Sequence, residues 1–316
     1  MSCEHVIFIV GPTAVGKTEV ACLLAEQLGA EIVSCDAMQV YRDVDIATNK
    51  PSRDILARIP HHLIDVRDVE EEFDVAAYND LARQAIRDIH SRRKTAIVTG
   101  GSGLYMQVLL DGIFQGAPKQ QHLRDELWQC WESEGAGVLF KELEERDPVA
   151  TRKIHPHDVR RIIRALEICR SMAKPFSQLQ QERAGLWAGR HGLTLIALNR
   201  PREALYGRIH ARTDDMFQEG LVEEIRRLLR RSLSPTARRI IGVSEVAGYL
   251  NREYGEDRAR YLMKLHTRHY AKRQLTWFRK ERRLQWVDIR EGMTARDVTE
   301  HIRTAVCPPD GRKAEN

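Results

Sequence analysis

The sequence predicts an α/β fold, a P-loop NTPase-like parallel sheet core with helices on both faces, joined to a helical insertion domain. Short apolar runs alternate with helix-period segments between His5 and Thr99, which is typical of a parallel sheet covered by helices. A glycine-rich turn stands between the first apolar run and the first helix, as in phosphate-binding loops. A long helical block then separates these elements from a later strand.

The strands are the short runs rich in β-branched and aromatic residues, and the helices are the segments with a 3.6-residue apolar period. Buried strands are predicted, in chain order, at His5–Val10, Glu31–Cys35, Thr95–Thr99 and Leu193–Leu198, with shorter candidates at Leu63–Val66 and Leu284–Ile289. Helices are predicted at Lys17–Leu28 and Ala76–His90, and again between Pro201 and Arg283.

This pattern divides the chain into three parts. Residues 1–115 and 193–300 are expected to form the P-loop α/β core with its C-terminal helices, and residues 116–192 a helical insertion. Residues 301–316 are expected to be a flexible tail, because Cys307–Asn316 is short, polar and rich in Pro and Gly.

Composition excludes several classes of protein. Hydrophobic residues make up 42% of the 316 residues, enough apolar content to exclude wholesale disorder. No apolar run approaches the ~18 residues of a transmembrane helix, and no basic region precedes the first apolar run, so we expect neither a membrane partner nor a signal peptide. The six cysteines form no C-x-x-C pair, and we expect reduced thiols in a cytoplasmic protein.

The net charge of +5 is concentrated in the second half of the chain. Three stretches, Thr151–Arg170, Arg226–Ile240 and Arg268–Arg283, carry many Arg and Lys residues and few acids. Such stretches are typical of proteins that bind a polyanion such as nucleic acid. Solvated helix faces explain them equally well, so charge alone leaves both interpretations open.

The turn Gly11-Pro-Thr-Ala-Val-Gly16-Lys17-Thr18 fits the pattern G-x-x-x-x-G-K-[ST]. Glycines let the backbone wrap a phosphate, and the amides and the helix N-terminus supply positive potential. Lys17 is expected to reach a terminal phosphate, and the Thr18 hydroxyl to bind Mg²⁺. The predicted phosphate-binding residues are Gly11, Pro12, Thr13, Ala14, Val15, Gly16, Lys17 and Thr18.

The usual acidic partner of a P-loop is missing from its expected place. The strand Thr95–Thr99 leads into Gly100, Gly101 and Ser102, and Asp65 is only a weak substitute. The bound phosphates could therefore belong to ATP or to another diphosphate. Asp36 directly follows the second strand, where the carboxyl ends of parallel strands face the ligand crevice. Its position alone leaves three roles open for Asp36: a general base, a Mg²⁺ ligand or a cap of the next turn.

Several separated motifs resemble the tRNA dimethylallyltransferases, also called tRNA isopentenyltransferases or IPP transferases. In chain order they are GPTAVGKT (Gly11–Thr18), SCDAMQVYRDVDIATNKP (Ser34–Pro51), PHHLIDV (Pro60–Val66), GGSGLY (Gly100–Tyr105), HPHDVRRIIRALE (His155–Glu167) and YAKRQLTWFR (Tyr270–Arg279). They extend over roughly Val6 to Arg283.

The resemblance implies transfer of a dimethylallyl group from dimethylallyl diphosphate to N6 of the adenosine at position 37, 3′ of the tRNA anticodon. It implies that the P-loop holds the prenyl donor and not ATP, which agrees with the missing acid. It also implies Mg²⁺ as cofactor and the anticodon stem-loop of tRNA as partner. Nothing in the sequence demands more than a monomer.

The resemblance also implies roles for particular residues. Asp36 would be the general base, Lys17 and Thr18 would stabilise the leaving diphosphate, Ser102 would contact the substrate, and Arg212 would lie near the diphosphate. The residues expected to contact tRNA are Asp36, Ala37, Met38, Gln39, Ser102, Arg160, Arg161, Ile162, Ile163, Arg164, Lys272, Arg273, Gln274 and Arg279. Trp277 and Phe278 could stack on bases or pack in the core, and packing is favoured.

Two segments depart from the family pattern. Ile46–Pro51 reads IATNKP where many bacterial members have IGTAKP. Ile241–Glu245 reads IGVSE where many have Val-Gly-Tyr-Arg/Lys-Gln, which puts the tRNA contact there in doubt and suggests an altered tRNA preference.

Other functions are less well supported. A P-loop kinase of a nucleotide or small molecule would use the loop and Asp36 but lacks the acid after the strand. A nucleic-acid-binding module with a vestigial P-loop would bind tRNA without turnover. The pairs His61-His62 and His155-Pro-His157 lack a third metal ligand at a convincing spacing, and Gly101-Ser102-Gly103 is not a hydrolase elbow.

Overall fold

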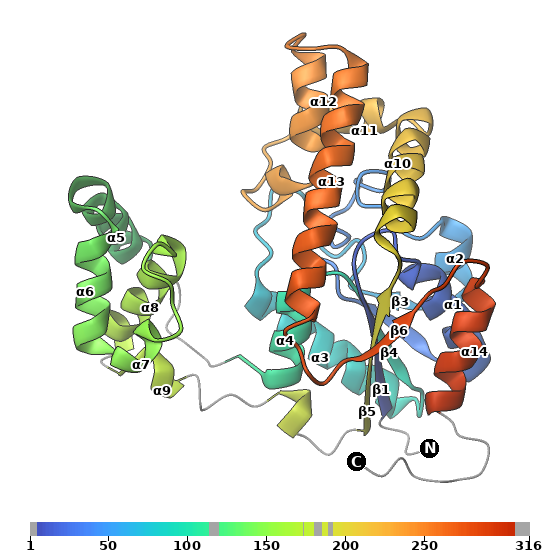
Figure 1. The fold of residues 1–316 in the computed structure, drawn as a ribbon, viewed down its shortest axis with the longest axis horizontal. Helices are drawn as coiled ribbons and strands as arrows, with labels where there is room; N and C mark the ends of the chain where they lie inside the picture. Colours follow the sequence, from blue (N-terminus) through green and yellow to red (C-terminus); the bar gives the residue numbers. More distant parts are fainter. Residues whose placement is uncertain (1–4, 114–119, 173, 180–184, 189–191, 307–316) are drawn as a thin grey trace. The chain divides into compact units, whose positions relative to one another are not determined.

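The computed structural model describes residues 5–113, 120–172, 174–179, 185–188 and 192–306 (Figure 1). The chain divides into two compact units. The α/β unit comprises residues 1–109 and 190–316, and the helical unit comprises residues 110–189. The helical unit therefore interrupts the α/β unit once along the chain.

The α/β unit is built on a six-stranded sheet, and every strand pair in it is parallel. The strands are β1 (His5–Val10), β2 (Glu31–Ser34), β3 (His61–His62), β4 (Ala96–Gly100), β5 (Gly192–Asn199) and β6 (Gln285–Asp288). Their order is β3-β2-β4-β1-β5-β6, with β1 near the centre. The predicted α/β core with a parallel sheet is confirmed.

Helices cover both faces of the sheet. In Figure 1, α1 (Lys17–Leu28) and α14 (Ala295–Val306) lie on one side, and α3 (Val75–Ser91) and α4 (Gly103–Asp111) lie on the other. Local sequence sets their ends: α1 stops at Gly29, which adopts the left-handed conformation with φ 61°, and the Asp74 carboxylate caps the first turn of α3.

A second group of helices stands beyond the carboxyl ends of the strands (Figure 1). It comprises α10 (Arg202–Gln218), α11 (Leu221–Leu228), α12 (Val243–Leu250) and α13 (Glu256–Phe278). The short helix α2 (Arg53–Arg58) comes earlier in the chain, after β2. Helix α13 is 23 residues long but mostly polar. Within the described ranges, no helix combines the length and apolar character that crossing a membrane requires.

The helical unit has its own apolar core. Its helices are α5 (Gln121–Glu134), α6 (Ala136–Arg146), α7 (Pro148–Thr151), α8 (Val159–Met172), α9 (Phe176–Leu179) and the 3₁₀ turn η2 (Leu186–Ala188). Leu127, Leu143, Ile162 and Leu166 are among the side chains buried between α5, α6 and α8.

The structure corrects two of the sequence-based expectations. Strand β3 lies at His61–His62 and not at Leu63–Val66, because Leu63 and Asp65 adopt positive φ angles of 65° and 55° that end the strand. The flexible tail does not begin at residue 301, because α14 continues to Val306 and Ile302 is fully buried. Cys307–Asn316 lies outside the described residues.

Candidate functional site

The predicted phosphate-binding loop, Gly11–Thr18, connects β1 to the first turn of α1. Gly11 and Gly16 have φ angles of 148° and 110°, and a Cβ on Gly11 would come within 2.7 Å of the Leu198 carbonyl oxygen. Glycine is therefore required at Gly11 both for conformation and for space. The Lys17 ammonium folds back over the loop and donates a hydrogen bond of 2.8 Å to the Pro12 carbonyl oxygen.

Two half-buried cations, Lys17 and Arg212, stand at this loop. The pKa of Lys17 is lowered to about 8, chiefly by burial; Asp36 opposes this shift, and nearby Arg212 contributes to it. Burial likewise lowers the pKa of Arg212 to about 10. Arg212 comes from α10, and its Nη2 donates to Thr13 Oγ1 at 2.7 Å. Since burial disfavours both charged forms, an anion bound between these groups would be stabilised by both.

Asp36 lies where the loops after β2 and β4 meet. Its Oδ1 accepts a hydrogen bond of 2.9 Å from the Met38 amide, so one carboxylate oxygen does cap the following turn. The Ser102 hydroxyl accepts from the Ala37 amide at 3.1 Å, and the Ser102 amide donates to the Cys35 carbonyl oxygen at 3.1 Å. Ser102 therefore orients the segment that carries Asp36.

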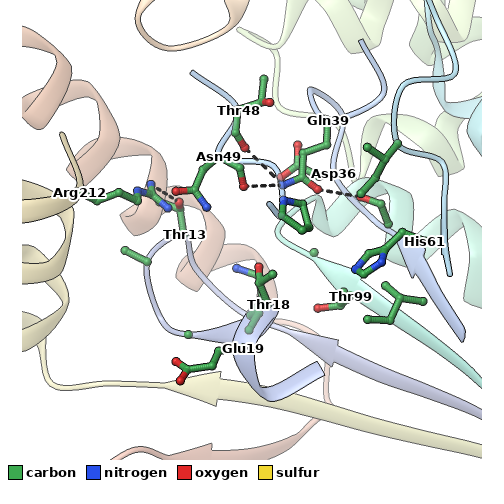
Figure 2. Close-up of a pocket in the computed structure, with 18 of the residues that line it drawn as sticks. Thr13, Thr18, Glu19, Asp36, Gln39, Thr48, Asn49, His61, Thr99 and Arg212 are labelled. Atoms are coloured by element: carbon green, nitrogen blue, oxygen red, sulfur yellow. Dashed lines mark hydrogen bonds between the residues drawn. The ribbon is translucent and has the colours of Figure 1, made fainter. Parts of the chain in front are cut away.

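Two cavities meet at Asp36. The P-loop cavity has a volume of about 440 Å³, and Figure 2 shows Thr18, Asp36, His61 and Arg212 around it. The second cavity, here called the α13 cavity, has a volume of about 280 Å³ and is lined by Met263, Tyr270 and Arg273, among others. Residues common to both walls are Thr13, Asp36, Thr48, Asn49 and Arg212. A carboxylate and an arginine thus stand at the junction of two ligand-sized spaces.

The lining of the P-loop cavity is chemically divided. Lys17 and Thr18 supply a polar, cationic region at the P-loop, whereas Ile32, Pro51 and Ile64 supply apolar surface. A ligand with an anionic head and a short apolar tail matches this division.

The loop between β2 and α2 forms the wall between the two cavities, and hydrogen bonds from other segments hold it. The Gln39 amide donates to the carbonyl oxygens of Thr48 and Asn49 at 3.3 and 3.1 Å (Figure 2). Glu224 on α11, which is only 4% exposed, accepts from the amides of Asp45, Ile46 and Ala47 at 2.8, 2.9 and 2.9 Å. Sequence reasoning missed Glu224, because no local pattern marks a contact this distant along the chain.

Gln274 was expected to contact tRNA, but the structure places it in the interior. The side chain is 5% exposed. Its Oε1 accepts from the Thr13 amide at 2.8 Å, and its Nε2 donates to the Gly101 carbonyl oxygen at 2.9 Å. Lys272 and Arg273 on the same helix, and Arg279 at its C-cap, are exposed. The expectation for Gln274 is therefore wrong, because both polar ends of its amide are occupied inside the protein.

Two further members of the predicted tRNA-contacting set are also buried. Ile162 and Ile163 on α8 are 0% and 2% exposed and belong to the apolar core of the helical unit. Arg164 forms an ion pair of 2.8 Å with the buried Glu167, and Arg161 forms one of 3.2 Å with Asp158. Arg160 and Arg161 are the exposed cations of this motif.

The aromatic pair near the end of α13 packs inside the α/β unit, as the sequence analysis favoured. Phe278 is fully buried. A Cβ on Gly103 would lie 2.1 Å from Trp277 Cδ1, so the indole rests on the bare backbone at the start of α4. The glycine in GGSGLY thus makes room for this tryptophan.

The departure at Ile241–Glu245 also has a structural account. Glu245 is buried, and its carboxylate accepts from the Gly242 amide at 2.8 Å, which caps α12. The same carboxylate pairs with His266 Nδ1 on α13. This glutamate therefore ties two helices together and does not present its side chain to an RNA.

The adjacent histidines His61 and His62 each contact a group within the protein. His62 Nε2 lies 2.8 Å from Glu31 Oε2, and His61 Nδ1 lies 2.7 Å from the Ile59 carbonyl oxygen. No group of three or more His, Cys, Asp or Glu side chains that could hold a metal ion occurs among the residues with described positions.

Comparison with known proteins adds three findings. The family model described as IPP transferase matches residues 39–281. The chain is 41% identical over 303 residues to the tRNA dimethylallyltransferase of Geobacillus kaustophilus, covering 95% of this chain and 96% of that protein. It is 43% identical over 290 residues to the tRNA dimethylallyltransferase of Geobacter sulfurreducens, covering 91% and 93% of the two chains.

Solved structures give the same result. The tRNA isopentenylpyrophosphate transferase of Bacillus halodurans superposes with a TM-score of 0.67 at 36% identity, with 95% of each chain covered. A eukaryotic dimethylallyltransferase described as acting on tRNA superposes with a TM-score of 0.81 at 28% identity, covering 95% of this chain and 78% of that one.

Proposed function

The chain belongs to the IPP transferase family, and from this premise we propose that it is an enzyme that transfers a dimethylallyl group to tRNA. The donor is dimethylallyl diphosphate, the acceptor is N6 of the adenosine at position 37, and diphosphate is released. One observation carries this proposal: Asp36 and Arg212 stand at the junction of the P-loop cavity and the α13 cavity.

The donor occupies the P-loop cavity, with its diphosphate at the loop and its prenyl tail toward Ile32 and Ile64. As the allylic C–O bond breaks, negative charge collects on the diphosphate. Lys17, the loop amides and the N-terminus of α1 stabilise that charge. Arg212 adds a second cation, and its contact with Thr13 holds it at the loop.

The acceptor adenine enters the α13 cavity after leaving its base stack. Its exocyclic amine is a weak nucleophile, because the nitrogen lone pair is delocalised into the ring. As the N6–carbon bond forms and the carbon–oxygen bond breaks, the Asp36 carboxylate takes one N6 proton. Ser102 keeps the carboxylate in place through the Ala37 amide.

Mg²⁺ fits this site through the donor rather than through a cluster of acids. The Thr18 side chain lines the P-loop cavity, and Mg²⁺ in such sites keeps several waters and binds substrate phosphates. When bound, the ion would neutralise part of the diphosphate charge. Thr18 is the residue of this chain that would hold it.

Exposed cations contact the phosphates of the tRNA anticodon stem-loop. They are Lys272 and Arg273 on α13, Arg279 at its C-cap, and Arg160 and Arg161 on the helical unit. Arg273 also lines the α13 cavity. We further propose that the protein acts as a cytoplasmic monomer, for which light scattering during gel filtration is the direct test.

Mass spectrometry of tRNA nucleosides tests the activity. The protein is incubated with unmodified tRNA carrying adenosine at position 37, Mg²⁺ and dimethylallyl diphosphate, and a gain of one C5H8 unit on adenosine is expected. A parallel reaction with ATP tests the kinase alternative. ATP consumption without any prenylated adenosine would favour a kinase, and tRNA binding without either reaction would favour a binding module.

A further inference from the structure

We propose that Gln274 is a positioning residue for prenyl transfer, because its amide sets the distance between the diphosphate cradle and the base Asp36. The inference rests on the proposed function and goes beyond it, since Gln274 itself lines neither cavity. Its side chain connects two loops that each carry one half of the reaction.

The contacts of Gln274 are specific to an amide. Oε1 accepts from the Thr13 amide at 2.8 Å, and Nε2 donates to the Gly101 carbonyl oxygen at 2.9 Å. A Cβ on Gly101 would lie 2.1 Å from Nε2, so only the bare backbone of glycine admits this approach. Glutamine is the residue of this length that presents one acceptor and one donor.

Each end of the amide leads to one reacting group. Thr13 is part of the P-loop, and its hydroxyl accepts from Arg212. Gly101 immediately precedes Ser102, whose hydroxyl accepts from the Ala37 amide beside Asp36. The side chain of Gln274 therefore spans from the leaving-group side to the proton-accepting side of the site.

The anchor of this connection is rigid. Gln274 lies on the 23-residue helix α13, flanked one turn away on each side by the fully buried Ala271 and Phe278. A side chain locked by packing on a helix positions its neighbours more accurately than one on a loop. A displacement of about 1 Å between reacting groups lowers a rate by about 10²-fold, so loss of this bridge should reduce the chemical step.

Two variants test the proposal against wild type. Gln274→Met keeps the length and removes both hydrogen bonds, and Gln274→Glu keeps the acceptor for Thr13 but loses the donor to Gly101. Thr299→Val is the matched control, because it also removes a buried side-chain hydrogen bond, that of the Thr299 hydroxyl to the Ala295 carbonyl oxygen on α14. For each, kcat, KM for tRNA, KM for donor and the thermal midpoint are measured.

Gln274→Met is expected to lower kcat at least ~10-fold with KM for tRNA changed less than ~3-fold, whereas Thr299→Val changes only the thermal midpoint. In Gln274→Glu the carboxyl group donates to Gly101 only when it is protonated. The kcat of this variant per folded molecule, relative to wild type, should therefore rise as the pH is lowered from 8.5 to 6, with the folded fraction at each pH measured by circular dichroism so that a pH-dependent loss of stability is separated from the effect on catalysis.

A folded Gln274→Met variant with wild-type kcat would overturn the proposal. If that variant does not fold, Gln274→Glu decides, and a ratio to wild type that is flat with pH would overturn it. The wild-type protein in the same assay tests the proposed function separately. If wild type forms no prenylated adenosine, both proposals are removed. If wild type turns over and the variants are unimpaired, only the positioning role of Gln274 is removed.

Discussion

Arg212 on α10 donates a hydrogen bond of 2.7 Å to the hydroxyl of Thr13 in the P-loop, across 199 positions of sequence. The P-loop near the N-terminus thus receives a half-buried cation from the second half of the chain. The pKa of that guanidinium is lowered to about 10 by burial, so it remains charged at neutral pH. This contact places the arginine at the P-loop, where the proposed donor would bind.

Replacing Arg212 by Met should lower kcat by about 10²–10³, the usual effect of removing one group that stabilises transition-state charge. KM for the donor should also rise. The measurement is steady-state prenylation with varied dimethylallyl diphosphate. Arg202→Met, an exposed arginine on the same helix, is the control and should leave both constants unchanged. Equal behaviour of the two variants would remove Arg212 from the donor site.

Asp36→Asn should lower the rate of the chemical step by about 10²–10⁴ and leave tRNA affinity nearly intact. Asparagine can still accept the hydrogen bond from Met38, so the turn is preserved and only the proton acceptor is lost. Single-turnover prenylation and filter binding of tRNA measure the two effects. A parallel loss of rate and affinity would contradict the assignment of Asp36 as base.

Donor use should weaken as the pH rises above about 8. Burial lowers the pKa of Lys17 to about 8 in the free protein, and only the ammonium attracts diphosphate. We expect kcat/KM for dimethylallyl diphosphate to fall by about tenfold per pH unit above that value, because the free-enzyme pKa governs this ratio. Lys17→Met should show a low kcat/KM without this decline. The measurement is a pH profile between 6.5 and 9.5 at constant ionic strength.

Glu224→Gln should destabilise the protein by about 1–3 kcal/mol, because at least one of the three backbone amides that donate to the buried Glu224 carboxylate would face an NH2 group instead of an oxygen. Activity should fall as well, since the loop held by Glu224 carries Thr48 and Asn49. Urea unfolding measures the free energy of unfolding. Glu223→Gln, the exposed neighbour, should change it by less than about 0.5 kcal/mol.

Binding of tRNA should weaken steeply with salt if the exposed cations of α13 contact phosphates. Lys272→Ala and Arg273→Ala should each reduce the slope of log Kd against log salt by about 1, with little dependence on RNA sequence. Arg296→Ala on α14 removes an exposed charge far from this face and should leave the slope unchanged. Binding isotherms between 50 and 300 mM salt provide the slopes.

The sequence predicts the local features of this protein well. The strand His5–Val10 and the helix Lys17–Leu28 were predicted with the bounds that the structure has, because a buried strand, a glycine turn and a helix follow one another without interruption. Helix α14 was not predicted, although Val298, Ile302 and Val306 repeat every four residues on one face and are buried. That periodicity was a usable signal.

Contacts between distant segments were not predictable in the same way. The interior position of Gln274 depends on Thr13 and Gly101, which come from two other loops. A motif read as a unit also hides which way each side chain faces: in His155–Glu167 the isoleucines enter a core and the arginines do not. Helical periodicity separates those two sets, whereas nothing local identifies the partners of Gln274 or Glu224.

The position of β1 in the sheet has a consequence for synthesis of the protein. β1 pairs with β4 on one side and with β5 on the other, and β5 follows the entire helical unit in sequence. Because translation delivers the N-terminus first, one edge of this apolar strand stays unpaired on the nascent chain until residues 192–199 have left the ribosome. The helical unit is continuous and can fold in the meantime. The nascent chain therefore carries an exposed apolar strand edge during this interval, which is a template for edge-to-edge aggregation.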